Sequence, residues 1–173
     1  LADFLHLTLP NDASGTEPYS TSIQRIDAPP SWQKVMAQTE GSVRVPEHPI
    51  CLFPGAFNPP HDGHIQIKDL AARATGRTTY FELSIHNVDK PSLDYLEIKK
   101  RLDALESSGP VLLTNAPTFI EKARLFPGAI FAVGVDTLER IDAPRYYDSI
   151  EARDAAIEEL IALNVTFLVF GRL

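Results

Sequence analysis

Residues 50–64 read Ile-Cys-Leu-Phe-Pro-Gly-Ala-Phe-Asn-Pro-Pro-His-Asp-Gly-His. The first four are apolar and are stopped by Pro54 and Gly55, which is typical of a short buried strand in a parallel sheet. Apolar residues then recur at helical spacing from Ile67 onward and end at Gly76. The stretch therefore predicts a strand, a tight turn and a helix, which is the opening unit of an α/β domain.

The same alternation continues along the chain. Further strands are predicted over residues 78–85, 111–114, 129–133 and 165–170, because these runs are short and rich in apolar and β-branched residues. The helices between them are predicted from Ile67, Leu70, Ala71 and Ala74, from Tyr95, Ile98, Leu102 and Leu105, from residues 117–126 beginning at Pro117, and from Ile157, Leu160 and Ile161. Together they predict a Rossmann-like α/β fold, a parallel sheet of about five strands with flanking helices and right-handed crossovers.

Residues 1–49 differ in composition from the rest. They hold six of the 14 prolines and a Ser/Thr-rich stretch over residues 14–22. This density predicts a Pro-rich N-terminal arm or linker, with one helical turn at residues 32–36. Residues 1–5 fit either a short packed arm or the end of an upstream domain. Since the chain begins at Leu1 and stops directly after an apolar run, we expect it to continue at both ends, with residues 50–173 as a domain truncated at its C-terminus.

Charge and cysteine content narrow the function classes. The formal net charge of −7 argues against a general nucleic-acid binder, which needs a basic surface. Cys51 stands alone, so no intrachain disulfide can form and a reducing, cytoplasmic location is expected. No apolar run approaches the roughly 20 residues that cross a bilayer, so no membrane partner is expected. The sequence leaves the oligomeric state open, a homo-oligomer included.

The turn after the first strand has the chemistry of a phosphate site. In open α/β sheets, ligands bind beyond the carboxyl ends of the strands. Gly55 lets the backbone approach a phosphate closely, and Asp62 is predicted as the N-cap of a helix whose free N–H groups face the ligand. His61 and His64 are three residues apart, so both imidazoles can face one point.

Two other interpretations of the histidine pair are weaker. His-x-x-His is also half of a zinc site, but no cysteine and no acidic residue at helical spacing completes it. We therefore predict no protein-bound metal at His61 and His64. Two incidental histidines in a surface turn would not explain the whole string after a predicted strand.

Residues 55–64 resemble the first signature of the HxGH nucleotidyltransferases. The Phe-Asn-Pro-Pro version resembles the nicotinate and nicotinamide mononucleotide adenylyltransferases in particular. Residues 132–138, Ala-Val-Gly-Val-Asp-Thr-Leu, are similar to the Gly-x-Asp segment that follows the fourth strand in this family. The two matches and the strand order between them cover residues 50–173.

The resemblance implies a reaction and a set of site residues. It implies transfer of AMP from ATP to a mononucleotide or similar phosphorylated acceptor, with release of pyrophosphate, Mg²⁺ accompanying the nucleotide, and a place in NAD biosynthesis. His61 and His64 are then the catalytic donors to the triphosphate. The nucleotide-binding residues that it implies are Gly55, Ala56, Phe57, Gly63, Gly134 and Asp136. Asp136 also fits the N-cap of a short helix over residues 137–140.

Several further residues have two interpretations each. Lys90 fits a phosphate-binding role and Asn87 an acceptor-binding role, but residues 87–91 also fit ordinary turn chemistry. Residues 139–154 are highly charged and predict a solvated face, within which Tyr146 and Tyr147 either pack or line an acceptor pocket. His86 fits a half-buried structural residue, and Cys51 an inert buried one.

One departure from the family pattern concerns the C-terminus. Family members have a Ser/Thr-rich turn with an Arg or Lys that grips the outer phosphates, and none follows Phe170. Arg172 is the nearest cation and is expected to contact the nucleotide. We expect residues 1–173 to bind a nucleotide weakly and to gain activity when a continuation is restored. A cytidylyltransferase using CTP, another phosphorylated acceptor, and a non-catalytic nucleotide-binding module of a larger protein remain alternatives.

Overall fold

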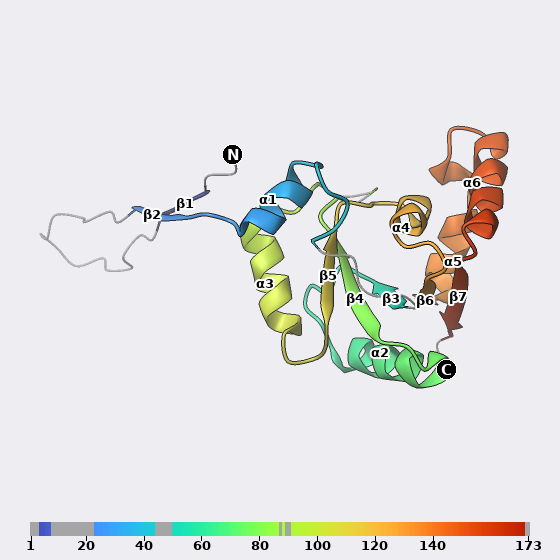
Figure 1. The fold of residues 1–173 in the computed structure, drawn as a ribbon, viewed down its shortest axis with the longest axis horizontal. Helices are drawn as coiled ribbons and strands as arrows, with labels where there is room; N and C mark the ends of the chain where they lie inside the picture. Colours follow the sequence, from blue (N-terminus) through green and yellow to red (C-terminus); the bar gives the residue numbers. More distant parts are fainter. Residues whose placement is uncertain (1–3, 8–22, 44–49, 87, 89–90, 172–173) are drawn as a thin grey trace, which may run out of the picture.

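A computed structural model describes residues 4–7, 23–43, 50–86, 88 and 91–171. Five strands form one sheet in the order β5-β4-β3-β6-β7, and every neighbouring pair is parallel (Figure 1). The strands are β3 (Cys51–Pro54), β4 (Thr79–Ser84), β5 (Val111–Thr114), β6 (Ile130–Gly134) and β7 (Thr166–Phe170). The five predicted strands are confirmed, with each end shifted by at most one residue.

Helices cover both faces of this sheet. They are α1 (Pro30–Met36), α2 (Asp62–Thr75), α3 (Tyr95–Leu105), α4 (Phe119–Leu125), α5 (Val135–Asp142) and α6 (Ile150–Ala162), with a 3₁₀ turn, η1 (Pro144–Tyr146). The buried clusters place α1, α2 and α3 on one face and α4, α5 and α6 on the other. The Rossmann-like α/β fold is therefore confirmed.

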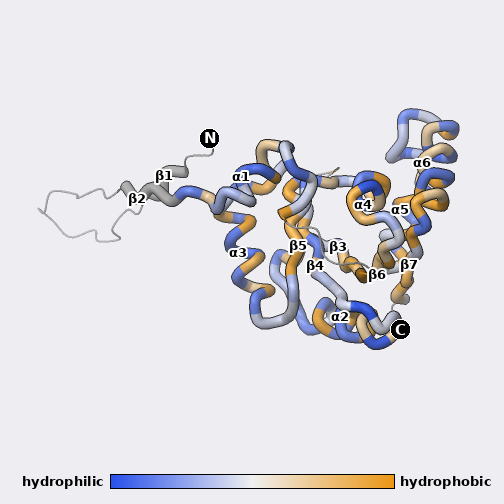
Figure 2. The backbone as a smooth tube through the Cα atoms, viewed as in Figure 1, coloured by the Kyte–Doolittle hydropathy of each residue, from blue (hydrophilic) through white to orange (hydrophobic). Residues whose placement is uncertain are grey.

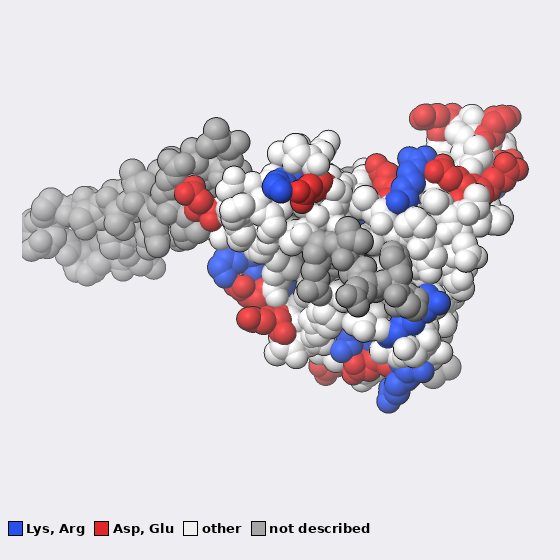
Figure 3. Space-filling view, viewed as in Figure 1, with Lys and Arg blue, Asp and Glu red and all other residues white. Residues whose placement is uncertain are grey.

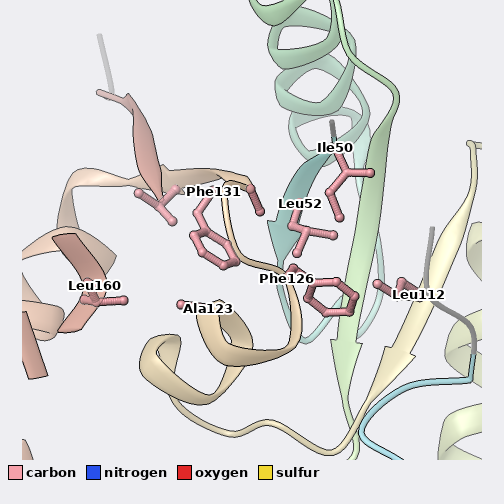
Figure 4. Packing of buried hydrophobic residues seen from close by; sticks show 9 residues of the cluster. Ile50, Leu52, Leu112, Ala123, Phe126, Phe131 and Leu160 are labelled. Carbon is pink, nitrogen blue, oxygen red and sulfur yellow. The ribbon is translucent and has the colours of Figure 1, made fainter. Parts of the chain in front are cut away.

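Alternate side chains of the central strand, β3, enter the core on opposite faces of the sheet. Cys51 and Phe53 face α2, whereas Ile50 and Leu52 face α4 together with Phe131 (Figure 4). Hydrophobic stretches of the tube include β5 and β6 (Figure 2). Burying each such side chain stabilises the fold by about 1.5–3 kcal/mol. Burial also raises the pKa of the Cys51 thiol, which agrees with its prediction as an inert residue.

The N-terminal arm is more ordered than its composition predicts. Strands β1 (Phe4–Leu7) and β2 (Ile23–Ile26) pair antiparallel and project from the body of the domain (Figure 1). Val35 of α1 is fully buried against α3 and β5, and Val43 N donates to Leu113 O at 3.0 Å. Residues 28–43 thus pack onto the sheet, and α1 includes residues 32–36.

The predicted helix faces need correction at three residues. Leu70 is 46% exposed and Ile161 is 72% exposed, while their neighbours Ala71 and Leu160 are buried. Consecutive helical residues lie about 100° apart, so only one of each pair faces the core. Ala74, in the last turn of α2, is also exposed.

The third predicted helix begins two residues later than expected. It starts at Phe119 instead of Pro117, because Thr118 and Glu121 form a reciprocal capping box that fixes its first turn. Acidic side chains gather over the α6 end of the molecule, consistent with the net negative charge (Figure 3). None of the helices within the described ranges is both long and apolar enough to cross a membrane.

Candidate active site

The strand order brings the two predicted site segments together. From β3 the chain winds outward through β4 to β5, then returns to the other side of β3 as β6. The switch point therefore lies between β3 and β6, which are hydrogen-bonded neighbours. The motif loop, defined here as residues 55–61, leaves the carboxyl end of β3. Gly134 ends β6 beside it, so two segments far apart in sequence form one edge.

The motif loop is held by contacts from two other elements. Gly55 N donates to Glu82 O of β4 at 3.1 Å, and Arg101 Nη1 of α3 donates to Ala56 O at 3.2 Å. The Phe57 ring is buried against Phe53 and Phe81, with centroids 5.5 and 5.1 Å away. The loop is thus fixed by the sheet below it and by α3 at its side.

Gly55 has a packing role that its sequence context did not reveal. Phe57 has a φ of +45°, which turns its ring back beneath the loop. A Cβ at position 55 would lie 2.6 Å from the Phe57 ring, so any other residue forces one of them to move. Gly63 is also constrained, since its Cβ would lie 3.1 Å from the His61 ring.

The helix that follows begins one residue earlier than predicted. His61, not Asp62, is the N-cap of α2, because His61 is still extended (φ −142°, ψ 169°) whereas Asp62 is already helical. Asp62 in the first turn still complements the helix dipole. With His61 at the cap and His64 in the third helical position, both histidines stand at the N-terminal end of a 14-residue helix.

His64 is held as a neutral donor. Its Nδ1 accepts a hydrogen bond from His61 N at 3.2 Å, which leaves the proton on Nε2. Burial lowers the pKa of His64, and the neighbouring His61 lowers it further. The two rings stack with centroids 3.7 Å apart, and Phe57 packs edge-on against His64. His64 therefore presents one oriented N–H, suited to a phosphate oxygen.

No further metal ligand lies beside the two imidazoles in the described part of the chain. No third His, Cys, Asp or Glu among these residues joins them in a group that could hold an ion.

Gly134 and Asp136 open the helix on the other side of the site. Gly134 is the N-cap of α5, and the helix starts at Val135, so the alternative of Asp136 as N-cap is wrong. Asp136 lies in the first turn and is exposed. Around Gly134, an added Cβ would meet no atom of the described residues within 4 Å, and φ is −77°, which any residue adopts. The open space beside Gly134 is free for a ligand.

These two glycines predict opposite stability effects. Gly55→Ala should lower the free energy of unfolding by about 1–3 kcal/mol, because overpacking displaces the Phe57 ring. Gly134→Ala should change it by less than about 0.5 kcal/mol, because its Cβ enters open space. Urea denaturation of both variants checks this. A Gly55→Ala protein as stable as the parent would show that the loop adapts freely.

A cavity of about 490 Å³ opens beside the motif loop. Its walls come from the loop and four further elements: Ala56, Val88, Pro117, Thr118, Phe119, Ile120, Thr137, Arg140, Ile141, Tyr146, Tyr147, Ala156 and Leu160. Tyr147 OH donates to Ile141 O at 2.6 Å, and burial raises the pKa of Tyr147, with Asp142 adding to the effect. Both tyrosines thus line a pocket, although residues 139–154 as a whole were predicted to be a solvated face.

Three predicted site residues lie outside the described residues: Asn87, Lys90 and Arg172. Val88, between the first two, lines the cavity. His86 is half-buried, as predicted, and its Nδ1 lies 2.6 Å from Ser92 Oγ.

Sequence reasoning missed a buried polar network beneath the site. Lys122 Nζ of α4 contacts the Glu82 carboxylate at 3.0 Å and also donates to Ala116 O, and Thr114 Oγ1 donates to Glu82. Glu82, Thr114 and Lys122 are all at least 96% buried. A signal existed, since Glu82 is a charged residue between the apolar Phe81 and Leu83 of a strand.

Comparison with known proteins agrees with this geometry. No curated protein matches the chain. Residues 52–167, from β3 into β7, match the cytidylyltransferase-like family, and this span contains the motif loop, both histidines and Gly134. The chain therefore belongs to the cytidylyltransferase-like family, within the HxGH nucleotidyltransferase superfamily.

Proposed function

We propose that this nucleotidyltransferase moves AMP from ATP to a mononucleotide or a similar phosphorylated acceptor and releases pyrophosphate. The observation that carries the proposal is the shared edge of the motif loop and Gly134, with the 490 Å³ cavity joined to it at Ala56. One part of this edge suits a triphosphate, and the cavity has the volume of a small-molecule site.

The chemistry needs positioning more than covalent help. A phosphate oxygen of the acceptor attacks the α-phosphorus, and the bond from that phosphorus to the α,β-bridging oxygen breaks. Pyrophosphate leaves with the electron pair. Negative charge grows on the leaving group, and the Nε2–H of His64, the His61 side chain and the N-terminus of α2 are donors suited to stabilise it. Mg²⁺ bound to the triphosphate would neutralise further charge.

The cavity suits an acceptor with a flat ring. Phe119, Tyr146 and Tyr147 provide aromatic walls, and Arg140 provides a guanidinium at the rim. Aromatic rings favour stacked or edge-on partners, and guanidinium favours phosphate or carboxylate. A mononucleotide has both a base and a phosphate, so it fits this combination.

The test is pyrophosphate release by the full chain. ATP and CTP are each supplied with Mg²⁺ and one of several acceptors: nicotinate mononucleotide, nicotinamide mononucleotide, and phosphorylated small molecules without a ring. Release that requires ATP and a mononucleotide supports the proposal. Release with CTP or with a ring-free acceptor changes the substrate but keeps the enzyme class. Nucleotide binding without release in any combination would favour the non-catalytic binding module.

Gly134→Ala separates a nucleotide role from a structural one. Because its Cβ enters space that no described residue occupies, a bound nucleotide at this edge is the partner that it is expected to meet. We expect the Kd for the nucleotide to rise by about tenfold, or about 1.4 kcal/mol, with unchanged stability. Isothermal titration of the parent and the variant measures this. Equal affinities would place the nucleoside away from Gly134.

Tyr146→Ala should act on the acceptor. Loss of a stacking wall is expected to raise the acceptor KM by about threefold to tenfold, while the KM of the triphosphate stays within about twofold. Tyr146 is chosen because Tyr147 is tied to Ile141 O. Steady-state kinetics with each substrate varied in turn checks the split, and an equal rise in both KM values would contradict it.

A further inference from the structure

Arg101 is a buried cation that reaches into the motif loop from a distant helix. The residue is 9% exposed and lies on the core-facing side of α3. Its Nη1 donates to Ala56 O and its Nη2 to Glu97 Oε2, both at 3.2 Å, whereas its buried Nε has no partner within the described structure. The guanidinium therefore has two acceptors, one of which is a backbone carbonyl 45 residues away.

Fold stability gives a poor account of this arrangement. A guanidinium remains charged at any physiological pH, and its removal from water is costly. Replacing a buried ion pair by apolar side chains is often neutral or stabilising. Glu97 is only partly buried, with 40% of its side chain exposed. Its attraction for Arg101 is therefore weakened by solvent and offsets little of the cost of removing the guanidinium from water.

The carbonyl that Arg101 holds belongs to the peptide between Ala56 and Phe57. This peptide is trans, because the cis bond of the loop is the one between Asn58 and Pro59. In a trans peptide the C=O and the N–H point in opposite directions. Arg101 draws the C=O toward α3, and the N–H of Phe57 is consequently directed to the other side of the loop.

Two features of Phe57 indicate that its backbone N–H donates a hydrogen bond to a bound ligand. No residue in the described structure accepts a hydrogen bond from it, although Phe57 is 98% buried. Buried backbone N–H groups are nearly always paired, so an unpaired one at a ligand edge points to an absent acceptor. The positive φ of Phe57 is also disfavoured by about 1–3 kcal/mol, so the surrounding contacts must hold it.

We infer that Arg101 is a positioning residue of the active site. It fixes the peptide between Ala56 and Phe57 so that the Phe57 N–H is aimed at the nucleotide phosphates, and Glu97 orients its guanidinium. The phosphate part of this inference rests on the proposed function, whereas the hold on the loop does not.

The test compares four variants of the full chain. Arg101→Met removes the donor but keeps the stem, and Arg101→Lys keeps the charge without the planar fork. Lys99→Met breaks the exposed Lys99–Asp103 pair on the same helix, which lies in the same i,i+4 relation. Ile98→Ala destabilises the fold from a buried position on α3 whose core cluster contains no residue of the motif loop.

The first readout needs no substrate. The Gly55 amide, bonded to Glu82 O, should exchange with solvent at least about tenfold faster in Arg101→Met. The Phe57 amide resonance should also shift. Neither should change in Lys99→Met, and in Ile98→Ala neither should change by more than the loss of global stability explains. Loop exchange in Arg101→Met that matches Ile98→Ala at equal stability overturns the inference.

The second readout is turnover. Arg101→Met should lower kcat by at least about tenfold with the acceptor KM within about twofold, and Arg101→Lys should restore part of it. Parental turnover in Arg101→Met would overturn the catalytic part of the inference. If the parent protein releases no pyrophosphate with any triphosphate, the proposed function fails, and the amide exchange of Gly55 still decides whether Arg101 holds the loop.

Discussion

His64→Ala is expected to lower turnover by about 10²–10⁴-fold, which corresponds to roughly 3–5 kcal/mol of transition-state stabilisation. The Nε2–H of His64 is fixed by the bond from His61 N to Nδ1, so the donor is already aligned before charge develops on the phosphates. Alanine removes it and leaves the helix N-terminus and the loop in place. Triphosphate binding should therefore weaken far less than turnover.

The matched control is His86→Ala. His86 is also half-buried, but it contacts Ser92 and Gln38 outside the motif loop. Pre-steady-state turnover and nucleotide titration are measured for both variants after thermal denaturation has shown that each is folded. Parental turnover in folded His64→Ala would contradict the assignment. Stoichiometric binding of a metal by His61 and His64 would do so as well.

Lys122→Met is expected to lower the free energy of unfolding by about 3–5 kcal/mol, the largest stability effect that we anticipate outside the apolar core. Glu82 is 1% exposed, and its carboxylate relies on Lys122 and Thr114 for compensation. Without the ammonium group, a buried carboxylate is left in a low-dielectric site, and Ala116 O also loses a donor.

Two controls separate burial from charge. Arg124→Met removes the exposed ion pair with Glu159 from the same helix and should cost no more than about 1 kcal/mol. The double variant Glu82→Gln with Lys122→Met removes both charges and should recover part of the loss. Urea denaturation of all three variants gives the comparison. A loss below about 1 kcal/mol in Lys122→Met would show that water or a rearrangement compensates Glu82.

The sequence predicts the sheet well because its strands differ strongly from the helices in pattern. Residues 50–53 and 111–114 are short apolar runs between turn residues, and parallel strands buried on both faces give this signal. The helix faces are less well predicted. An adjacent apolar pair such as Leu160 and Ile161 does not reveal which member faces the core, because this depends on how the helix lies on the sheet.

The parts of the candidate site that depend on local sequence could be predicted, whereas the contacts between distant segments could not. Residues 55–64 and Gly134 follow strand ends, so strand order alone brings them together. Arg101 lies three residues from Ile98 and four from Leu105 on the apolar side of α3, which marks it as unusual. Nothing in the sequence, however, says that its acceptor is Ala56 O. The roles of Asn87, Lys90 and Arg172 remain predictions.

The position of β3 at the centre of the sheet also bears on synthesis at the ribosome. Its partner β4 follows soon after along the chain. Its other partner, β6, ends at Gly134, which is 80 residues after β3 ends at Pro54. At roughly 5–20 residues per second, the second edge of β3 waits about 4–16 s for its neighbour. Cys51, Leu52 and Phe53, all buried in the finished fold, belong to this half-paired strand meanwhile. The nascent chain therefore has a period in which a half-paired apolar strand is available to chaperones, and to other nascent chains, before the motif loop and Gly134 meet.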